Sequence, residues 1–420
     1  MLTRAGCLAT WLLGFGVLCA AIPAGANTLY VTKTGSDSNS CTQISPCATF
    51  NRAFAVAAGG DTVQVAGGSY SAQNISGSAK SSTVTFQPVA GATVTLGGLS
   101  VQTSFVEVDN MTSTGGCDSE PADGGNPSAA THNTFRGMSC QTWFIIGQDI
   151  LVKGGNVGPY DACTGNGPED GVDIWQASGI GSTRITFDGV TIHDISDHGN
   201  ECAGTSRSGS HVDCMQILAG HFITVRNSQF YNCPTSDIIA RPYQDTLNDI
   251  TIENNFMQEV VTPGAALNLG NSTDKISGTN VVRYNVIQSA SVIFGQGGTV
   301  DIYGNILATG SCQAGTTFEH NVFSPSWSAS CGTAAKKGNP SFVGPTPGPA
   351  YLNGIVPNFR LAAGDTVAKD AGDPRFPATD IDGNARPQGP AADAGAFEYG
   401  AAVVTGQRPD PPTNLHATVQ

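Results

Sequence analysis

The sequence is short of charge and of the residues that build long helices. Of its 420 residues only 12% are charged, with 33 acidic against 19 basic side chains and a formal net charge of −14. Phosphate binding needs clustered Lys and Arg, so nucleic acid is not an expected partner. Leu, Lys and Glu are sparse, which argues against long helices.

A membrane-spanning segment is also missing from the sequence pattern. The N-terminal apolar run at residues 9–21 follows Arg4 and is too short for a comfortable span. The small-x-small pattern of Ala24-Gly25-Ala26 then offers a cleavage site. We therefore expect residues 1–26 to be a signal peptide, Asn27 to be the mature start, and the protein to be secreted to the extracellular space.

Cysteine, in contrast, is present in a number that favours disulfides. Cys7 and Cys19 lie in the expected signal peptide, which leaves an even ten of the 12 cysteines. Export and an even count favour disulfide bonds, and no CxxC or His/Cys spacing indicates zinc. Sequence alone leaves the connectivity open. Pairing near neighbours suggests Cys41–Cys47, Cys117–Cys140, Cys163–Cys202, Cys214–Cys233 and Cys312–Cys331.

Small and β-branched residues are abundant. Glycine contributes 53 residues, and Thr, Asn, Ser and Val are frequent, which favours short strands joined by tight turns. An opening strand is expected at residues 29–31, and apolar residues recur at helical spacing over residues 49–58. Further short strands are expected at 62–65, 84–86, 94–96 and 105–108.

One short phrase recurs from residue 185 onward. Each copy is an alternating strand that closes on Asn, Gly or Ser, and its irregular period indicates a solenoid of stacked coils. Asn tolerates the left-handed conformation of sharp corners, and its amide can form a ladder between coils. The copies are Ile185–Val190, Ile223–Ser228, Ile250–Asn255, Val282–Asn285, Val300–Asn305 and Thr317–Asn321.

The opening strand, helix and Gly-Asp-Thr-Val segment, together with these repeats, carry a family resemblance. Residues 28–398 resemble secreted right-handed parallel β-helix proteins of the pectate-lyase-like superfamily. The resemblance implies an all-β fold, a single-stranded right-handed parallel β-helix whose 49–58 helix caps the first turn. We expect one such domain over residues 27–400.

The C-terminal part of the sequence resembles the end motif of the same proteins, over residues 339–398. We interpret this motif as a cap that closes the open end of the solenoid. The alternative is a calcium loop at Asp380-x-Asp382-Gly383. Residues 401–420 resemble a linker and the truncated start of a fibronectin type III-like module.

Three aspartates lie in similar segments that follow loop-like excursions of the chain. Asp173, Asp213 and Asp237 each precede an apolar residue. In a shared phase, they would stack along one outer face of consecutive coils. Carboxylates at that spacing repel each other unless a cation or a shared proton intervenes. We therefore expect the three Asp to be metal ligands, with calcium as the cofactor and Glu169 and Asp170 nearby in sequence.

The family resemblance implies polysaccharides as partners. Acidic-polysaccharide lyases come first, followed by glycoside hydrolases, uronate epimerases and adhesins. Asp197-His198-Gly199 partly matches the polygalacturonase pattern, but the Asp-Asp and Arg-Ile-Lys motifs are missing. The leading hypothesis is a monomeric lyase that cleaves an acidic, uronate-containing polysaccharide by β-elimination. The alternatives are an inverting glycoside hydrolase and a non-catalytic carbohydrate-binding or adhesion β-helix.

Several side chains near the Asp segments have suitable chemistry for such a site. His211 is a candidate proton acceptor together with Asp213, although it can equally be a surface His bound to a turn. Arg241 can clamp a sugar carboxylate, or merely pair with Asp237 or Asp245. The candidate substrate-binding residues are His198, Trp175 and Tyr243, and the competing role of the two aromatic residues is packing.

Overall fold

The computed structural model describes most of the chain between residues 26 and 400. The described residues are 26–164, 169–243, 245–261, 264–270, 276–288, 292–294, 299–308, 312, 315–327 and 331–400. The expected signal peptide up to residue 25 and the fibronectin-like segment 401–420 lie outside them. The predictions for these two segments stay predictions.

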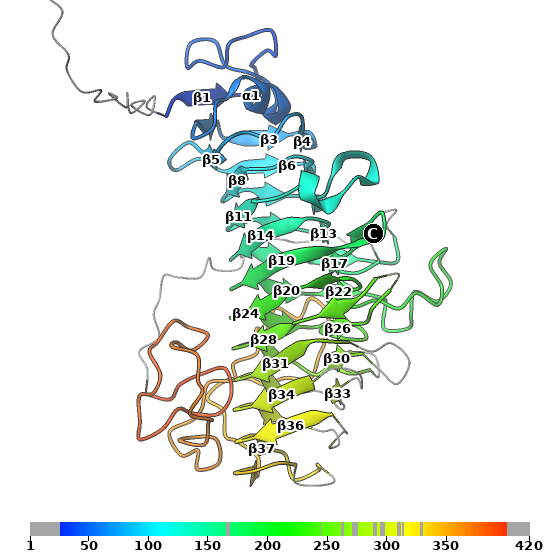
Figure 1. Cartoon of the computed structure of the whole chain (residues 1–420), viewed down its shortest axis with the longest axis vertical. Coiled ribbons are helices and arrows are strands. Elements are labelled where there is room, and N and C mark those ends of the chain that lie inside the picture. The colour runs from blue at the N-terminus through cyan, green and yellow to red at the C-terminus, as the bar shows by residue number, and fades with distance from the viewer. Residues whose placement is uncertain are drawn as a thin grey trace, which may run out of the picture.

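The described chain forms a right-handed parallel β-helix, as predicted (Figure 1). Each coil contributes strands to three long sheets, here called sheets 1, 2 and 3. Among the strand pairs of the described residues, β18 (Gln176–Ala177) and β19 (Ile180–Asp188) are the antiparallel pair, and the others are parallel. An antiparallel sandwich is thereby excluded.

The strands of the sheets are short, as the turn-rich composition predicts. Sheet 1 contains β1 (Thr28–Val31), β2 (Thr62–Val65), β5 (Val84–Pro88), β8 (Val106–Asp109), β11 (Thr134–Arg136), β14 (Gln148–Lys153), β19, β24 (Thr224–Arg226), β28 (Thr251–Glu253), β31 (Thr279–Arg283), β34 (Thr299–Tyr303) and β36 (Thr316–Glu319), with β18, β23 (Gly220–His221) and β27 (Leu247–Asn248) beside it. Sheet 2 contains β4 (Gln73–Ile75), β7 (Leu99–Val101), β10 (Cys117–Ser119), β13 (Trp143–Ile145), β17 (Val172–Ile174), β22 (Met215–Ile217), β26 (Ile238–Ala240), β30 (Leu267–Leu269) and β33 (Val292–Phe294).

Sheet 3 lies on the remaining side of the coil. It contains β3 (Gly68–Tyr70), β6 (Val94–Leu96), β9 (Thr112–Ser113), β12 (Ser139–Cys140), β15 (Asn156–Val157), β20 (Thr191–His193), β25 (Gln229–Tyr231), β29 (Phe256–Met257), β32 (Val286–Ile287), β35 (Ile306–Leu307), β37 (Val322–Phe323) and β38 (Lys336–Lys337). A small sheet pairs β16 (Tyr160–Asp161) with β21 (Ile195–Ser196), and two 3₁₀ turns lie at Ala122–Gly124 and Pro127–Ala129.

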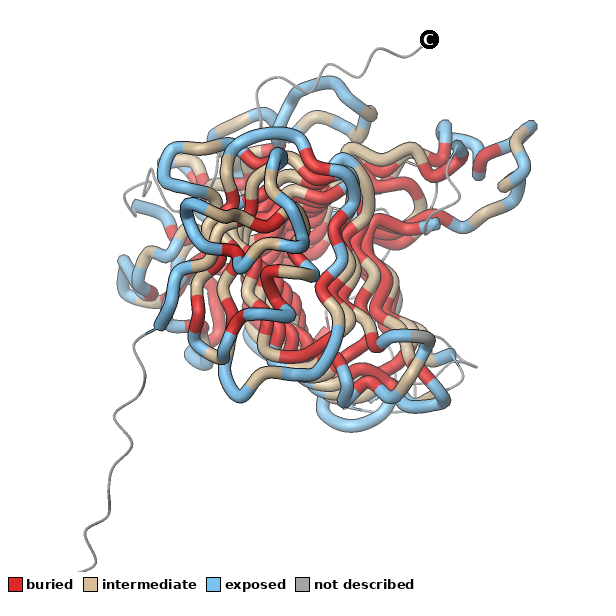
Figure 2. Tube along the Cα trace, turned by 90° about the horizontal axis from the view of Figure 1, so that it is seen from above, coloured by how far each residue is buried: buried red, intermediate tan, exposed pale blue. Residues whose placement is uncertain are grey.

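The core lies inside the coils because side chains alternate between the two faces of each strand. Phe86, Phe135 and Phe187 on successive parts of sheet 1 are fully buried. Figure 2 shows buried positions superposed along the solenoid axis when the molecule is seen from above. Burial of each such aromatic side chain contributes roughly 1.5–3 kcal/mol. The stack of coils is therefore held by one continuous apolar interior.

A ladder of asparagine amides confirms the interpretation of the repeated phrase. The Nδ2 atoms of Asn255, Asn285 and Asn305 donate at 3.0 Å to the Oδ1 atoms of Asn285, Asn305 and Asn321 respectively. All four residues are buried. The left-handed backbone is found one residue earlier in each coil, for example at Asn254 with φ 54°. The ladder residue and the corner residue are thus neighbours.

The N-terminal helix caps the first coil, as predicted. Helix α1 (Phe50–Val56) begins after Thr49, whose hydroxyl accepts from the N–H of Arg52 at 3.1 Å. Phe50, Ala53 and Phe54 are buried, and α1 lies over the top of the solenoid (Figure 1). Their i, i+3, i+4 spacing places them on one helix face, which closes the apolar interior.

The C-terminal segment does not close the open end, so the predicted cap is wrong. Its apolar residues, including Phe359 and Phe397, pack against the outer face of sheet 3. Outward-facing Phe256 and Ile306 belong to the same apolar cluster, and the segment runs beside the solenoid in Figure 1. The segment thus seals a second apolar face over several coils.

The acidic loop in this C-terminal segment is occupied by protein groups. The Nε of Arg360 donates to Asp382 at 2.9 Å, and Asp380 accepts from the N–H groups of Asp382 and Asn384. These contacts favour a structural role for the loop over calcium binding.

The five predicted disulfide pairs are confirmed. The bonds are Cys41–Cys47, Cys117–Cys140, Cys163–Cys202, Cys214–Cys233 and Cys312–Cys331. Five disulfides fit the oxidising environment of an exported protein. Within the described residues, no helix has both the length and the apolar character that a membrane crossing needs.

Candidate active site

The pairing of β17, β22 and β26 shows that the predicted shared phase of the three aspartates is wrong. Asp173 lies opposite Gln216 on the next coil, and Gln216 lies opposite Ile239. Asp213 and Asp237 therefore belong to different positions along their coils from Asp173. The segments of Asp173 and Asp213 share the sequence pattern Val-Asp-x-x-Gln, at residues 172–176 and 212–216. Aligning them on this pattern produces the error, because the fold aligns the buried apolar residues of each strand instead.

The corner that precedes these strands brings a different set of carboxylates together. The N–H of Gly171 donates to the carbonyl of Asp213 at 3.1 Å, so the parallel ladder continues ahead of β17. Asp170 therefore lies opposite Asp213 on the next coil. The N–H of Met215 donates in turn to the carbonyl of Asp237 at 3.1 Å. Asp237 thus lies one residue past the position opposite Asp213.

These carboxylates are buried, so the prediction of a solvent-facing stack is also wrong. Asp213 and Asp237 are 0% exposed, and Asp170 and Asp173 are 3% and 7% exposed. The N–H of Asp213 donates to Oδ1 of Asp170 at 2.6 Å, which fixes one carboxylate against the main chain of the next coil. The result is a cluster of four carboxylates with little access to water.

Burial and mutual repulsion raise the pKa values of all four carboxyl groups in the cluster. The pKa of Asp170 is well above its ordinary value because of burial, with further contributions from the charges of Asp213 and Asp173. Burial raises the pKa of Asp173 to about 7. Burial and the charge of Asp213 hold the pKa of Asp237 well above its ordinary value. The cluster therefore requires shared protons or a bound cation at neutral pH.

His211 contacts this cluster from the solvent side. Its Nδ1 lies 2.8 Å from Oδ2 of Asp213, and its side chain is 47% exposed whereas that of Asp213 is fully buried. The close carboxylate of Asp213 raises the pKa of His211, whereas burial and, to a smaller extent, the charge of Arg241 oppose this rise. His211 and Asp213 precede β22 and have opposite burial, so they do not share the outward orientation expected for one strand.

Arg241 and an aromatic pair lie at the other end of the same strands. Arg241 follows β26, and its charge acts on His211. Trp175 and Tyr243 follow β17 and β26 and have their ring centroids 5.6 Å apart, with Tyr243 50% exposed. The predicted sugar-binding aromatic residues are thus adjacent. A half-exposed aromatic pair of this kind presents a ring face on which a sugar can stack.

His198 lies on the excursion loops that flank the cluster. Its Nε2 is 3.1 Å from Oδ2 of Asp161, and both side chains are largely exposed. The Cys163–Cys202 disulfide joins the two loops. Because Cys163 is in this disulfide, its sulfur is not available beside Asp161 and His198 as a thiolate metal ligand.

Asp237 provides a test of whether the cluster fits a cation. Among the described residues, neither of its buried carboxylate oxygens has a hydrogen-bond partner. An uncompensated buried carboxylate is costly, so Asp237 must be protonated or paired with a positive charge. Its carboxylate also lies within 4.8 Å of the disulfide sulfurs of Cys214 and Cys233, which are not thiolate ligands. The oxygen-only set Asp170, Asp173 and Asp213 has the donor chemistry of a hard cation site, but its three carboxylates do not all lie within 4.8 Å of one another.

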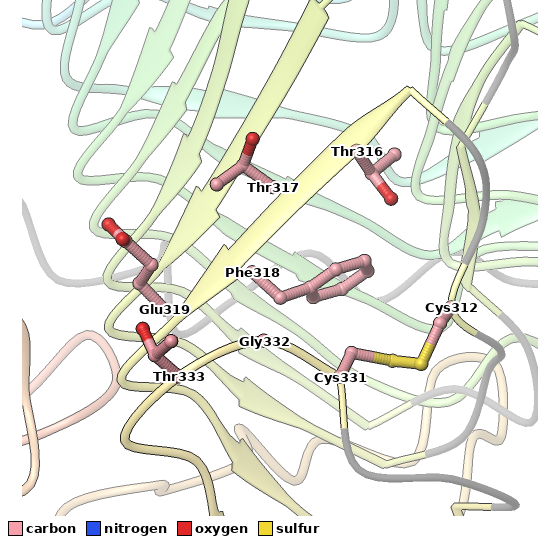
Figure 3. Close-up of a pocket in the computed structure, with 8 residues that line it drawn as sticks. All are labelled: Cys312, Thr316, Thr317, Phe318, Glu319, Cys331, Gly332 and Thr333. Atoms are coloured by element: carbon pink, nitrogen blue, oxygen red, sulfur yellow. A yellow bond between two sulfur atoms is a disulfide. The ribbon is translucent and has the colours of Figure 1, made fainter.

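A pocket of about 480 Å³ lies away from this cluster, at the C-terminal end of the solenoid (Figure 3). Its walls include Phe318 and the Cys312–Cys331 disulfide. The carboxylate of Glu319 is already paired with the guanidinium of Arg375. Among the described residues that line this pocket, no uncompensated charge is available to a substrate.

Sequence reasoning gave Asp170 only as a neighbour and did not single out Tyr160. When the buried residues of β17 and β22 are aligned, Gly171 matches Cys214. Asp170 then matches Asp213, because each lies one residue earlier. Tyr160 is half-buried, and its pKa is raised mainly by burial, with a contribution from the charge of Asp173. Only the three-dimensional fold brings β16 beside the cluster.

Comparison with known proteins gives structural similarities of low identity. No family model matches the chain, and no curated protein matches it. Among solved structures, it is similar to pectate lyase Pel9A, with 16% identity, coverage of 89% of this chain and 97% of that one, and a TM-score of 0.49. It is also similar to XylC in complex with xylose, with 10% identity, coverage of 71% and 76%, and a TM-score of 0.42. A rhamnogalacturonan lyase matches with 12% identity, coverage of 72% and 75%, and a TM-score of 0.36. Because these identities and TM-scores are low, the matches carry no argument about the reaction of this chain.

Proposed function

We propose that this chain is a carbohydrate-active enzyme, a lyase that cleaves an acidic polysaccharide by β-elimination. The observation that supports this most is the pair formed by His211 and Asp213. A half-exposed imidazole lies 2.8 Å from a fully buried carboxylate, so its ring orientation is fixed while one edge stays accessible. A positioned histidine of this kind is a suitable proton acceptor.

In this proposal His211 removes the proton from C5 of a uronate residue. Its Nδ1 faces Asp213, so Nε2 is the atom that takes the proton. The electron pair of the C5–H bond forms the C4–C5 double bond, and the bond from C4 to the glycosidic oxygen breaks. The imidazolium then donates the proton it took from C5 to the leaving glycosidic oxygen, which returns His211 to its neutral form. Arg241 pairs with the uronate carboxylate through its guanidinium fork.

Asp170, Asp173 and Asp213 would hold calcium in the same proposal. Carboxylate oxygens are the ligands calcium prefers, and the three residues repel each other when ionised. When bound, calcium would neutralise the substrate carboxylate and make the C5 proton more acidic. Asp213 would connect the two functions, because it contacts His211 as well as the carboxylate cluster.

The close packing of Asp170 and Asp173 supports this reaction over inverting hydrolysis by that pair. An inverting glycosidase keeps its two carboxyl groups about 6.5–9.5 Å apart to admit a water molecule. Asp170 and Asp173 are close enough to hydrogen-bond to each other through their side chains. Such a pair suits a shared proton or a shared cation, whereas it leaves no room for the attacking water.

The aromatic pair supports a carbohydrate as the partner. Trp175 and Tyr243 lie at the far end of the strands that carry the cluster, and sugars stack on such rings. We propose a secreted monomer that binds the polysaccharide along sheet 2, with Trp175 and Tyr243 holding one sugar. His198, on the flanking loops, would contact the chain near its entry.

The test is incubation of the purified protein with a panel of uronate polysaccharides, with and without a chelator. The absorbance of the unsaturated product and the number of new reducing ends are measured separately. The proposal predicts unsaturated product that disappears with chelator and returns with calcium. Reducing ends without unsaturation would instead show a hydrolase. Retention on a glycan affinity gel without cleavage would show a binding module.

A further inference from the structure

A second cavity, of about 450 Å³, adjoins the carboxylate cluster on the N-terminal side of sheet 2. Its polar lining includes the side chains of Ser100, Asp118, Gln141, Thr142 and Tyr160. They come from consecutive coils that carry β7, β10 and β13 and from β16. The proposed reaction uses none of these residues.

Glycines occupy one corner of the coil beside this cavity. Gly97 and Gly115 do not have positive φ, so conformational freedom does not explain them. A Cβ on Gly97 would lie 3.0 Å from the N of Ala72, and one on Gly115 would lie 2.5 Å from the carbonyl of Gly97. These coils approach each other too closely at both positions for a side chain, which explains glycine at this corner. Asp170 and Asp213 occupy one position of successive coils. In the earlier coils this position is held by Gly97 and Gly115, which have no side chain.

A disulfide fixes the walls of the cavity. Cys117 directly follows Gly116 and bonds to Cys140, which directly precedes Gln141. Both Gly116 and Gln141 line the cavity. The bond therefore holds two consecutive coils at the point where the cavity opens. A preformed polar cavity of this kind loses little conformational entropy when it binds a ligand.

Strand register places the cavity in line with the candidate active site, with Phe144 between them. Asp118 lies opposite Phe144, and Phe144 lies opposite Asp173, so Asp118 and Asp173 occupy one column two coils apart. Two strand spacings amount to about 10 Å, which is close to the length of a disaccharide. Tyr160 lines the cavity and also lies close enough to Asp173 that the charge of Asp173 contributes to the raised pKa of Tyr160.

The lining chemistry distinguishes the ligand of the cavity from that of the carboxylate cluster. None of the described residues that line the cavity is a Lys or Arg, so a second uronate would find no cation there. Hydroxyl, amide and carboxylate groups are all able to hydrogen-bond to sugar hydroxyls. Asp118 would repel an anionic sugar when ionised, whereas it accepts hydrogen bonds from a neutral one.

We propose that this cavity is a subsite for a neutral sugar residue, located about two residues from the cleaved linkage. The inference rests on the proposed function, because it places the cleaved linkage at His211. It deepens that function by naming the substrate class. The natural substrate is then a heteropolysaccharide that contains both uronate and neutral sugars, not a polymer of uronate alone.

The test compares two hexasaccharides by calorimetric titration. One contains only uronate, and the other alternates uronate with a neutral hexose. The wild-type protein should bind the alternating ligand at least 10-fold more tightly. Asp118→Ala and Gln141→Ala should each weaken this binding about 10-fold, a loss of about 1.4 kcal/mol. The affinity for a uronate disaccharide should stay unchanged in both variants. Asn74→Ala, exposed in the same column of sheet 2, is the matched control and should bind like wild type.

The outcomes separate this inference from the proposed reaction. Equal affinity for the two hexasaccharides, or equal losses for both in the variants, would overturn the subsite. Thermal unfolding of each variant checks that the fold is retained, and Gln141→Ala provides a second readout if Asp118→Ala unfolds. Binding of the alternating ligand without any cleavage would support the subsite and contradict the lyase reaction. Cleavage with no preference for the neutral sugar would support the lyase reaction and contradict the subsite.

Discussion

Oδ1 of Asp170 accepts a hydrogen bond of 2.6 Å from the backbone N–H of Asp213 on the next coil. The carboxylate of one coil is therefore positioned by the main chain of the following one. Asp170 thus has two roles, as a hydrogen-bond acceptor and as a negative charge. Replacement by Asn separates them, because the amide side chain keeps the acceptor oxygen and lacks the charge.

Substitution at position 170 should reveal both roles. Asp170→Asn keeps the acceptor and removes a buried charge, so its melting temperature should equal or exceed that of wild type. Its calcium affinity should fall at least 10-fold, as measured by calorimetric titration. Asp170→Ala should in addition lose about 1–3 kcal/mol of unfolding free energy, because the buried N–H of Asp213 loses its partner. Equal destabilisation by both substitutions, or unchanged calcium affinity, would contradict this account.

The asparagine ladder should carry measurable stability. Asn285 donates to Asn305 and to the carbonyls of Ile252 and Arg283, and it accepts from Asn255. Asn285→Ala leaves several buried groups unpaired, at a cost of about 1–3 kcal/mol each. We expect chemical denaturation to show a loss of at least about 2 kcal/mol.

Asn353 is an exposed asparagine and serves as the control for the ladder. Its substitution by Ala should change the unfolding free energy by less than about 0.5 kcal/mol. A similar loss at positions 285 and 353 would show that the amide ladder adds no specific stability.

Asp118 should make folding stability depend on pH. Burial, followed by the charge of Glu120, raises the pKa of Asp118 from 3.8 to about 7. Between these values the folded protein keeps a proton that the unfolded chain releases, so this residue lowers stability as the pH rises. The slope is at most about 1.4 kcal/mol per pH unit for one proton. In Asp118→Asn this contribution vanishes, so its stability advantage over wild type should grow from about pH 4 to about pH 7. Parallel stability curves from chemical denaturation would refute the assignment.

The solenoid could be predicted because its signals are local and repeated. The ladder residues Asn255, Asn285, Asn305 and Asn321 close similar phrases, and the spacing of Phe50, Ala53 and Phe54 marks the cap. The disulfide pairs followed from sequence proximity, since consecutive coils place nearby cysteines side by side. Each of these inferences needs information from one coil and its neighbour only.

The position of the C-terminal segment depends on a signal that sequence reasoning overlooked. The strand Phe256–Met257 has two apolar residues in succession, as do Val286–Ile287 and Ile306–Leu307. Successive side chains point to opposite faces, so these strands expose an apolar outer face that needs a cover. The C-terminal segment provides this cover.

The structure brings several of the predicted site residues near one another, but not in the predicted geometry. Asp173, Asp213, His211 and Arg241 do influence one another electrostatically. Their register was wrong because the excursion loops change the number of residues between coils. Sequence similarity around an Asp then no longer reports its position along the coil. The burial of the cluster likewise depends on contacts between distant loops.

The most direct test of the proposed site measures product formation and melting temperature together in Asp213→Asn. The account predicts that no unsaturated product forms from a uronate polysaccharide that the wild type cleaves. The melting temperature should not fall, because the substitution is isosteric and removes a buried charge. His211→Ala should lower turnover by roughly 100-fold or more, as expected for the loss of an acid–base group. An Asp213→Asn protein that melts earlier than wild type yet cleaves at the full rate would contradict the account.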